Sequence, residues 1–317
     1  MLKFIITSLV LLLSLHSFGQ TGDLSPIFDL SPDGEKIVVA VSEGEFSQLY
    51  QYAFKDHSIT PLTNNKKEYH SRPVYSPSGN KVLFLSKSST NQQSDLYLLD
   101  IASKTVTKLT KGETYVTEAV FSPKGDKIIY CGAGYLGSYS PIARKAPHDL
   151  DLFSIQSDGK GFKKLTDLSA YSLSSLSLSQ SGDTVMCSLT EKELDGIYLL
   201  SLSDTTVRQK IEAVNNPRPQ IGNFFYSNPM YAPNFKSLSF IAPYQLYTLG
   251  LHTKECQEVW STFGKEEQAM PIFSRFFKSG DQLIFSILKI ENRQYARSAE
   301  LLIVDLKTKK TTKVEMK

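Results

Sequence analysis

The histidines are the first residues to test for chemistry, because imidazole can act as a metal ligand or as a general base near neutral pH. The chain has five of them. We expect His70 and His148 to approach one common surface, and His57 and His252 to lie in turns on the opposite side. Neither His70 nor His148 has a cysteine or carboxylate at metal-ligand spacing. The sequence therefore predicts no metal and no cofactor.

Catalytic motifs are also missing from the sequence. It contains no His-Glu-x-x-His, Cys-x-x-Cys, phosphate-binding glycine loop, calcium loop or Gly-x-Ser-x-Gly nucleophile turn. Asp29 and Glu118 are kept as an alternative acid–base pair, although carboxylates are common on any surface. The sequence therefore favours a protein that is not an enzyme.

Composition narrows the class of partner. The 317 residues are 41% hydrophobic, which is enough to bury a large core. Lys and Arg number 35 and Asp and Glu number 32, so the net charge is only +3. Such a balance gives no reason to expect nucleic acid or an anionic membrane as the main partner. Three cysteines are too few for a disulfide scaffold.

A turn motif that recurs six times organises the chain. Its clear copies have the form Ser-Pro-x-Gly after an apolar residue and before a β-branched run, which is typical of a type I turn between antiparallel strands. The clear copies are Leu30–Gly34, Tyr75–Gly79 and Phe121–Gly125, and the weaker ones are Leu178–Gly182, Tyr231–Phe235 and Phe276–Gly280. Successive copies are 45, 46, 57, 53 and 45 residues apart. The chain therefore contains six repeats of one supersecondary unit.

A second apolar anchor follows each turn, as in Asp95–Asp100, and leads into a short strand such as Thr105–Thr110. Each unit therefore has four strands, A to D, and its central strands are apolar on both faces. Such sheets predict an all-β fold, a six-bladed β-propeller of four-stranded antiparallel blades, in one domain over 20–317. The expected blades are 24–63, 69–110, 115–166, 171–212, 225–261 and 270–316. We expect the first and last blades to close the ring by packing.

The N-terminus has the pattern of a secretory signal. Lys3 is followed by an apolar stretch from Phe4 to Leu15, and Ser17 and Gly19 are the small residues that a signal peptidase reads. Twelve residues at about 1.5 Å each span roughly 18 Å, which is too short to cross a bilayer. We therefore expect residues 1–19 to be removed and the protein to reach the periplasm or the exterior without membrane insertion.

The repeat unit resembles the WD40-like PD40 repeats of the TolB family. The resemblance rests on the two anchors, [FYL]-S-P-x-G-x-x-[IVL] and [DGQE]-[IL]-[YF]-x-[ILV], from about Leu24 onward. It is strong in the first three repeats and weaker afterwards, where Gln180, Phe235 and Lys278 depart from the pattern. TolB has an additional α/β domain before its propeller, whereas here the signal leads directly into the first repeat. The resemblance implies a propeller of the bacterial cell envelope, but not TolB's partner binding through that extra domain.

Two long connections indicate where a partner would bind. One is the B–C connection of the third repeat, and the other precedes the fifth repeat. Both fall on the rim that holds the B–C and D–A connections, and elaborated loops on a rigid scaffold are where binding usually occurs. The alternative is that these connections are merely longer and bind nothing. The candidate residues are Tyr135, Tyr139, Arg144 and His148 in the first connection and Phe225 and Tyr226 in the second.

The inner strands supply a second group of candidates. The residue seven positions before the turn glycine is often polar, as Arg72, Glu118 and Asn228 show, and position five adds Asp29 and Arg275. These positions share a face of a strand, so we expect them to line the central channel. The competing interpretation is that they pair with each other, for instance Arg72 with Glu118, and only stabilise the ring.

Cys131 and Cys187 fall in the B strands of adjacent repeats. Facing sheets lie about 10 Å apart, whereas a disulfide needs Cα atoms within roughly 7 Å. We therefore expect buried free thiols.

The leading hypothesis is an exported, non-enzymatic binding or scaffold propeller. It would engage an envelope protein or a glycan through the elaborated rim, as a monomer or as a subunit of a larger complex. The alternative is a carbohydrate-active propeller enzyme, a lyase or hydrolase, with its site at the channel mouth.

Overall fold

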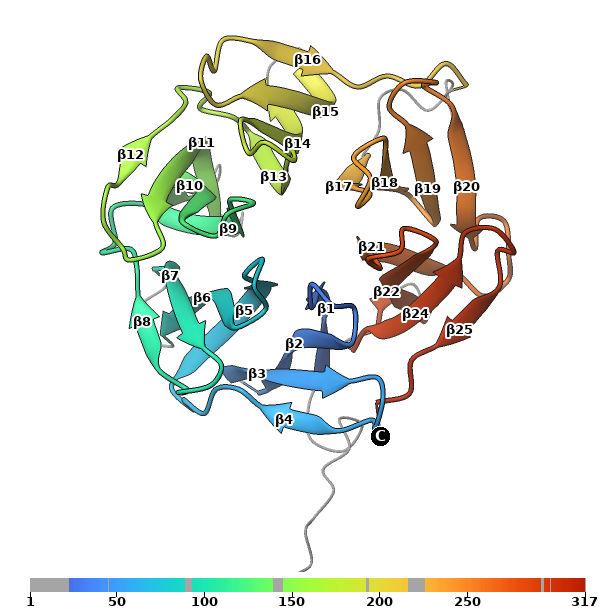
Figure 1. Cartoon of the computed structure of the whole chain (residues 1–317), viewed down its shortest axis with the longest axis horizontal. Coiled ribbons are helices and arrows are strands. Elements are labelled where there is room, and N and C mark those ends of the chain that lie inside the picture. Colours follow the sequence, from blue (N-terminus) through green and yellow to red (C-terminus); the bar gives the residue numbers. More distant parts are fainter. Residues whose placement is uncertain are drawn as a thin grey trace, which may run out of the picture.

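The computed structural model describes residues 23–44, 46–88, 93–138, 145–191, 194–215, 226–291, 294–296 and 298–316. All regular elements of this part of the chain are β-strands. They form four-stranded antiparallel groups arranged around a central axis as a propeller (Figure 1). The expected signal segment 1–19 lies outside the described residues. Within them, no helix has the length and apolarity that crossing a membrane would require.

The strands follow the six sequence repeats. The first repeat contains β1 (Asp23–Leu30), β2 (Lys36–Glu43), β3 (Phe46–Ala53) and β4 (Ile59–Pro61), and the second contains β5 (Glu68–Tyr75), β6 (Lys81–Ser88), β7 (Asp95–Asp100) and β8 (Val106–Lys108). The third contains β9 (Tyr115–Phe121), β10 (Lys127–Gly137), β11 (Ala146–Gln156) and β12 (Lys163–Lys164), and the fourth contains β13 (Ser172–Leu178), β14 (Thr184–Glu191), β15 (Leu194–Ser201) and β16 (Arg208–Lys210). The fifth contains β17 (Ser227–Tyr231), β18 (Ser237–Ala242), β19 (Gln245–Gly250) and β20 (Cys256–Ser261). The sixth contains β21 (Ala269–Phe276), β22 (Gln282–Glu291), β24 (Glu300–Asp305) and β25 (Thr311–Lys313), with β23 (Gln294–Tyr295) paired to the end of β22.

The count of hydrogen-bonded sheets differs from the expected six. Among the described residues there are five: one of eight strands, three of four strands and one of five strands. The eight-stranded sheet forms because β3 and β5 share one parallel residue pair, Ser47 with Tyr69, which joins the first repeat to the second. A partner for the edge of β3 was not visible in the sequence, because the repeat pattern shows strands within a unit and not contacts between units.

The recurrent turn has the geometry that its residues predict. In the first copy the Gly34 N–H donates to the Ser31 carbonyl at 2.8 Å, and the Lys36 N–H donates to the Ser31 hydroxyl at 2.9 Å. The turn glycine has φ +80°, a conformation that costs glycine little. In the fifth copy Phe235 takes this position with φ 54°, so the turn persists without its glycine.

The turns also pack against each other around the ring. A Cβ added to Gly79 would lie 3.4 Å from the ring of Pro32 in the preceding repeat, and the same relation joins Gly125 to Pro77. Where the ring closes, a Cβ added to Gly34 would lie 3.4 Å from the ring of Phe277 in the last repeat. Glycine is therefore favoured at these positions by the backbone conformation, while an added Cβ would stand in ordinary van der Waals contact with the neighbouring turn.

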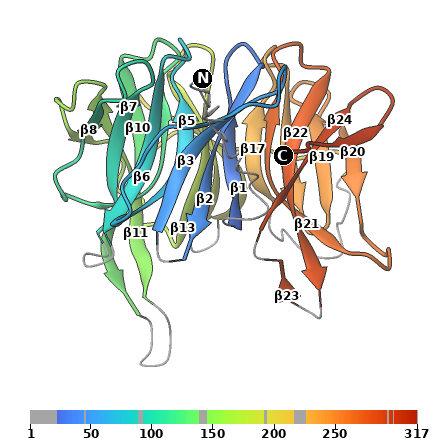
Figure 2. The same cartoon turned by 90° about the horizontal axis from the view of Figure 1, so that it is seen from below.

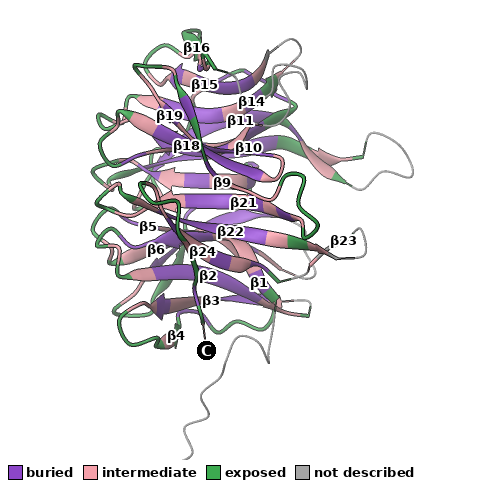
Figure 3. Ribbon diagram, turned by 90° about the vertical axis from the view of Figure 1, so that its right-hand side faces the viewer, coloured by how far each residue is buried: buried purple, intermediate pink, exposed green. Residues whose placement is uncertain are grey.

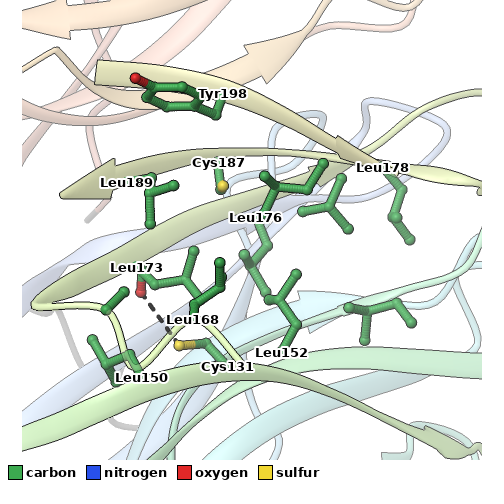
Figure 4. Packing of buried hydrophobic residues seen from close by; sticks show 14 of the residues in the cluster. Cys131, Leu150, Leu152, Leu168, Leu173, Leu176, Leu178, Cys187, Leu189 and Tyr198 are labelled. Carbon is green, nitrogen blue, oxygen red and sulfur yellow. Dashed lines mark hydrogen bonds between the residues drawn. The ribbon is translucent and has the colours of Figure 1, made fainter. Parts of the chain in front are cut away.

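The core lies between successive sheets and not in one central layer (Figure 3). The cluster between the third and fourth repeats contains Cys131, Leu152, Leu173 and Cys187 (Figure 4). Both cysteines are buried free thiols, in agreement with the sequence expectation. Because burial disfavours the thiolate, it raises the pKa of Cys131 to about 12, while the Cys131 thiol donates to the Leu173 carbonyl at 3.3 Å.

The ring closes where the first repeat meets the last. Leu24, Phe28 and Ile37 share an apolar cluster with Phe273 and Leu301. The Ala299 N–H donates to the Leu24 carbonyl at 2.9 Å, and the Ser286 hydroxyl donates to the Pro26 carbonyl at 2.6 Å. Among the described residues, each terminal sheet contains strands from its own end of the chain only, and packing and these contacts join the two ends.

Candidate functional site

A passage runs along the axis of the ring, lined by the inner strands. Two cavities of about 240 and 330 Å³ share six lining residues, one from each repeat, so they are parts of one passage. The shared residues are Asp29, Val74, Val120, Ser177, Met230 and Arg275. These are the residues five positions before the turn in each repeat. At this level the channel wall is half apolar, and its two charged residues, Asp29 and Arg275, lie at the junction of the first and last repeats.

The inner strands carry irregularities that the period of two did not predict. A register shift interrupts β5, β13 and β17 just before this lining position, and Arg72, Ser175 and Asn228 there have φ of 50°, 62° and 50°. Arg72 and Glu118 still line the 240 Å³ cavity, as expected. Asn228 does not line either cavity and is buried. The expected channel position of Asn228 is therefore wrong, because its amide side chain faces the sixth repeat, where the Oδ1 accepts the Ser274 N–H.

One ion pair joins the second repeat to the third. The Arg72 Nη1 lies 3.3 Å from the Glu118 Oε2, and the two side chains are 35% and 14% exposed. Glu118 also accepts the backbone N–H of Ser175 at 2.8 Å and of Leu176 at 2.6 Å, both in the fourth repeat. The Glu118 carboxylate therefore holds its own repeat to both neighbouring repeats. With three donors bound, it has little capacity left to accept a hydrogen bond from a ligand.

A second ion pair closes the ring on the same principle. The Arg275 Nε lies 2.6 Å from the Asp29 Oδ1, and the Asp29 Oδ2 accepts the Tyr75 N–H of the second repeat at 2.8 Å. The Arg275 guanidinium also lies 4.0 Å above the centre of the Phe273 ring, where a cation is attracted to the π face.

Together these contacts make a polar belt, which we define as Asp29, Arg72, Glu118, Ser175, Asn228 and Arg275 with their hydrogen-bond partners. The belt continues from the fourth repeat to the fifth, where the Asn228 N–H donates to the Ser175 hydroxyl at 3.2 Å. It reaches the sixth repeat where the Asn228 Oδ1 accepts the Ser274 N–H at 2.7 Å. Every junction between successive repeats therefore has a polar contact from the belt, which matches the pairing interpretation of these residues.

The elaborated rim, the edge of the ring that holds the B–C and D–A connections, differs from the belt. The ends of β10 and β11 project from it, on the same side as β23 (Figure 2). On this ribbon Tyr135 pairs with His148 across the strands, and their rings stack at 4.9 Å. His148 is buried and its Nε2 lies 3.1 Å from the Gly137 carbonyl oxygen, whereas Tyr135 is 52% exposed. The buried imidazole thus supports an exposed aromatic face.

Two further aromatic residues on this rim were missed by the sequence analysis. Tyr171 is 63% exposed, and its N–H bonds to Thr190 beside the β14–β15 connection. Phe263 is 56% exposed and follows Thr262, whose N–H bonds to Tyr244 in the β18–β19 connection. Both lie in short D–A connections, and loop length therefore does not distinguish them. Aromatic residues directly before strand A or after strand D would have been the useful signal.

The remaining candidates have other positions. His70 is buried beneath the rim, where its Nδ1 lies 2.9 Å from the Thr63 hydroxyl and its Nε2 lies 3.1 Å from the Glu68 carboxylate. Desolvation lowers the pKa of His70 more than Glu68 raises it. Tyr226 is half-buried and packs edge-on against Phe240 at 5.0 Å. Tyr139, Arg144 and Phe225 lie outside the described residues.

The described residues do not gather the groups of a metal centre, since no three His, Cys, Asp or Glu side chains converge on one point among them. This geometry favours binding by surface contact. The elaborated rim exposes aromatic rings, and the charged side chains that line the channel are already paired with each other.

Comparison with known proteins agrees with the architecture. Residues 16–134, less than half of the chain, match the family model of the dipeptidyl peptidase IV N-terminal region. The structure is similar to TolB from Acinetobacter baumannii with a TM-score of 0.64 and 12% identity, over 89% of this chain and 63% of that one. A protein assigned as TolB from Agrobacterium tumefaciens gives a TM-score of 0.61 and 14% identity, over 83% of this chain and 86% of that one. An oligogalacturonate lyase from Vibrio parahaemolyticus gives a TM-score of 0.58 and 12% identity, over 92% of this chain and 77% of that one.

At these identities the likeness shows the propeller fold alone. The chain spans less than two thirds of the length of the Acinetobacter protein. Its fold neighbours include both TolB proteins and an enzyme, so the fold does not choose between binding and catalysis.

Proposed function

We propose that the chain is a TolB-like, PD40-type propeller of the bacterial cell envelope that binds a protein partner through its elaborated rim. In this proposal residues 1–19 direct export to the periplasm or the exterior. The eight-stranded sheet counts as two blades, because one residue pair alone joins its halves, and the ring then has six. The role is that of a binding or scaffold module without catalysis.

One observation carries this proposal: the exposed aromatic side chains are concentrated on the elaborated rim. Among the described residues, the aromatic side chains that are more than half exposed are Tyr135, Tyr171 and Phe263, and all three lie there. Aromatic residues are enriched at protein interfaces and are frequent hot spots, since they bury a large area with few rotatable bonds. Of the other candidates, Tyr226 is half-buried on this rim and His148 is buried beneath Tyr135. Tyr139, Arg144 and Phe225 remain part of the proposal as sequence candidates outside the described residues.

The alternative is a carbohydrate-active enzyme with its site at the channel mouth. Its support is the likeness to a lyase and the presence of two arginines, Arg72 and Arg275, in one cavity. Against it stands the polar belt, in which Glu118 and Asp29 already hold both arginines. A glycan array and a sugar-cleavage assay separate the two functions.

The direct test is quantitative capture of envelope proteins from the native host. The wild-type protein is compared with a variant that carries Tyr135→Ser and Tyr171→Ser. A matched control is Phe162→Ser, which removes an aromatic side chain that is 46% exposed and precedes β12, at the other end of its repeat. The proposal expects partners that the wild type and the control retain and that the double variant loses. Equal capture by all three proteins contradicts it.

A further inference from the structure

A lysine of strand D forms an ion pair with a carboxylate of strand C in the second, third and sixth repeats. The fourth repeat keeps this lysine but has no carboxylate at the matching position. In the second repeat Lys108 of β8 pairs with Asp95 of β7 at 2.8 Å. In the third, Lys164 pairs with Asp151 at 3.1 Å, and in the sixth, Lys313 pairs with Glu300 at 3.3 Å. In each case the lysine lies opposite the residue two positions after the carboxylate.

The fourth repeat keeps the lysine and the register but not the acid. Lys210 lies opposite Tyr198, and two positions before Tyr198 is Gly196. A Cβ on Gly196 would lie 3.1 Å from the Lys210 Cε and 3.8 Å from its Nζ, so the lysine chain covers the room that the acid occupies elsewhere. In the described part of the chain, no carboxylate lies within ion-pair distance of Lys210, in contrast to its three counterparts.

The position two residues after the lysine has changed as well. In the second and third repeats the threonine two positions after the lysine donates its hydroxyl to the aspartate, as Thr110 does to Asp95 at 2.8 Å. In the fourth repeat this residue is Glu212, which is exposed. A closed group of lysine, aspartate and threonine has therefore become an open pair of separate charges, a cation and an anion.

A cavity of about 280 Å³ occupies this place, at the junction of the fourth and fifth repeats. Its polar lining includes Lys210, Glu212 and Asp195, and its apolar lining includes Ile197, Phe240 and Leu249. Asp195 accepts the Thr190 hydroxyl at 3.1 Å, whereas Lys210 and Glu212 have no side-chain partner within the described part of the chain. The volume lies just below the range of about 300–1,000 Å³ for drug-sized ligands.

We propose that this cavity binds a small zwitterion with an apolar body, of the class of an aliphatic α-amino acid. The ligand carboxylate supplies the missing negative charge from within the cavity and pairs with the Lys210 ammonium group. The ligand ammonium faces Glu212 and Asp195, and the apolar side chain packs against Ile197, Phe240 and Leu249. The site is separate from the channel, and it adjoins the elaborated rim, whose Tyr226 is part of its lining. The ligand proposed for it does not depend on the function proposed above.

The test is calorimetric titration of the whole protein with L-leucine. Two truncated analogues accompany it: 4-methylpentanoate, which lacks the ammonium, and 3-methylbutylamine, which lacks the carboxylate. We expect leucine to bind at least tenfold more tightly than either analogue. Absence of leucine binding, or equal binding of an analogue, overturns the proposal.

Matched substitutions locate the site. Lys210→Met should weaken leucine binding at least tenfold, and Lys108→Met, which removes the internally paired counterpart, should leave it unchanged. Because Lys210 has no ion pair to lose, its variant should melt like the wild type, and this keeps a failed titration from being a failure to fold. Equal weakening by both substitutions, or by neither, overturns the assignment to this cavity.

Discussion

The polar belt and the elaborated rim use their side chains in opposite ways. In the belt, Glu118 accepts three donors from two neighbouring repeats, and Asp29 also accepts two donors from two neighbouring repeats. The charged groups at the centre of the ring are therefore bound by other groups of the ring. On the rim, Tyr135, Tyr171 and Phe263 expose most of their area. The comparison teaches that polarity at a propeller axis does not by itself mark a binding site. The satisfied or unsatisfied state of each group is the better guide.

The largest expected effect comes from breaking the belt. Glu118→Ala leaves Arg72 and two backbone N–H groups without their acceptor, and we expect a loss of about 2–4 kcal/mol in the free energy of unfolding. Urea denaturation measures it. Arg72→Ala should cost less, because Glu118 keeps its two backbone donors. A loss below about 0.5 kcal/mol for Glu118→Ala would show that the belt is not structural.

The next effect concerns the rim, where we expect a substitution to lower the partner affinity and to leave the stability unchanged. Tyr171→Ser should reduce partner affinity roughly tenfold, since a truncated aromatic hot spot costs more than about 1 kcal/mol. Its free energy of unfolding should change by less than about 0.5 kcal/mol, because the side chain is exposed. Affinity by surface plasmon resonance and stability by urea denaturation are measured on the same sample. A Tyr171→Ser variant that loses stability and retains affinity would show that Tyr171 is structural, like the belt residues, and does not bind the partner.

A smaller effect is expected from pH, through His70. Its native pKa is lowered by burial below the ordinary 6.5, so the unfolded chain takes up a proton that the native protein resists. The free energy of unfolding should therefore fall as the pH drops below 6.5, until the native imidazole also protonates. Urea midpoints between pH 7.5 and pH 5 measure this slope. His70→Gln should flatten it, and an unchanged slope in that variant would show that His70 does not cause it.

The smallest effect is chemical. Burial raises the pKa of Cys131 to about 12 and that of Cys256 to about 11, and it also raises the pKa of Cys187. Since the thiolate is the nucleophile, native protein should react with iodoacetamide at pH 8 far more slowly than protein in urea. Mass spectrometry of alkylated peptides measures the difference. Rapid labelling of Cys131 or Cys187 in native protein would show that the third and fourth repeats separate readily.

The sequence predicts the repeated turns and strands well, because Ser-Pro-x-Gly and the apolar runs act locally. It also predicts the Arg72–Glu118 pair, since both residues occupy equivalent positions in successive repeats. The bulges are not visible in it, because Arg72, Ser175 and Asn228 take positive φ without the glycine that usually signals it. The alternation of strand residues also predicts Asn228 in the channel, whereas its side chain is buried. The join between β3 and β5 and the exposure of Tyr171 depend on contacts between repeats, which no local pattern records.

The measurement that tests the account most directly is amide hydrogen exchange of the wild-type protein, free and with its captured partner. The account predicts slower exchange in the partner complex at the ends of β10 and β11 and around Tyr171 and Phe263, with unchanged exchange in the inner strands β1, β5 and β9. Protection confined to those inner strands, with an unaffected rim, would contradict it and move the binding site into the channel.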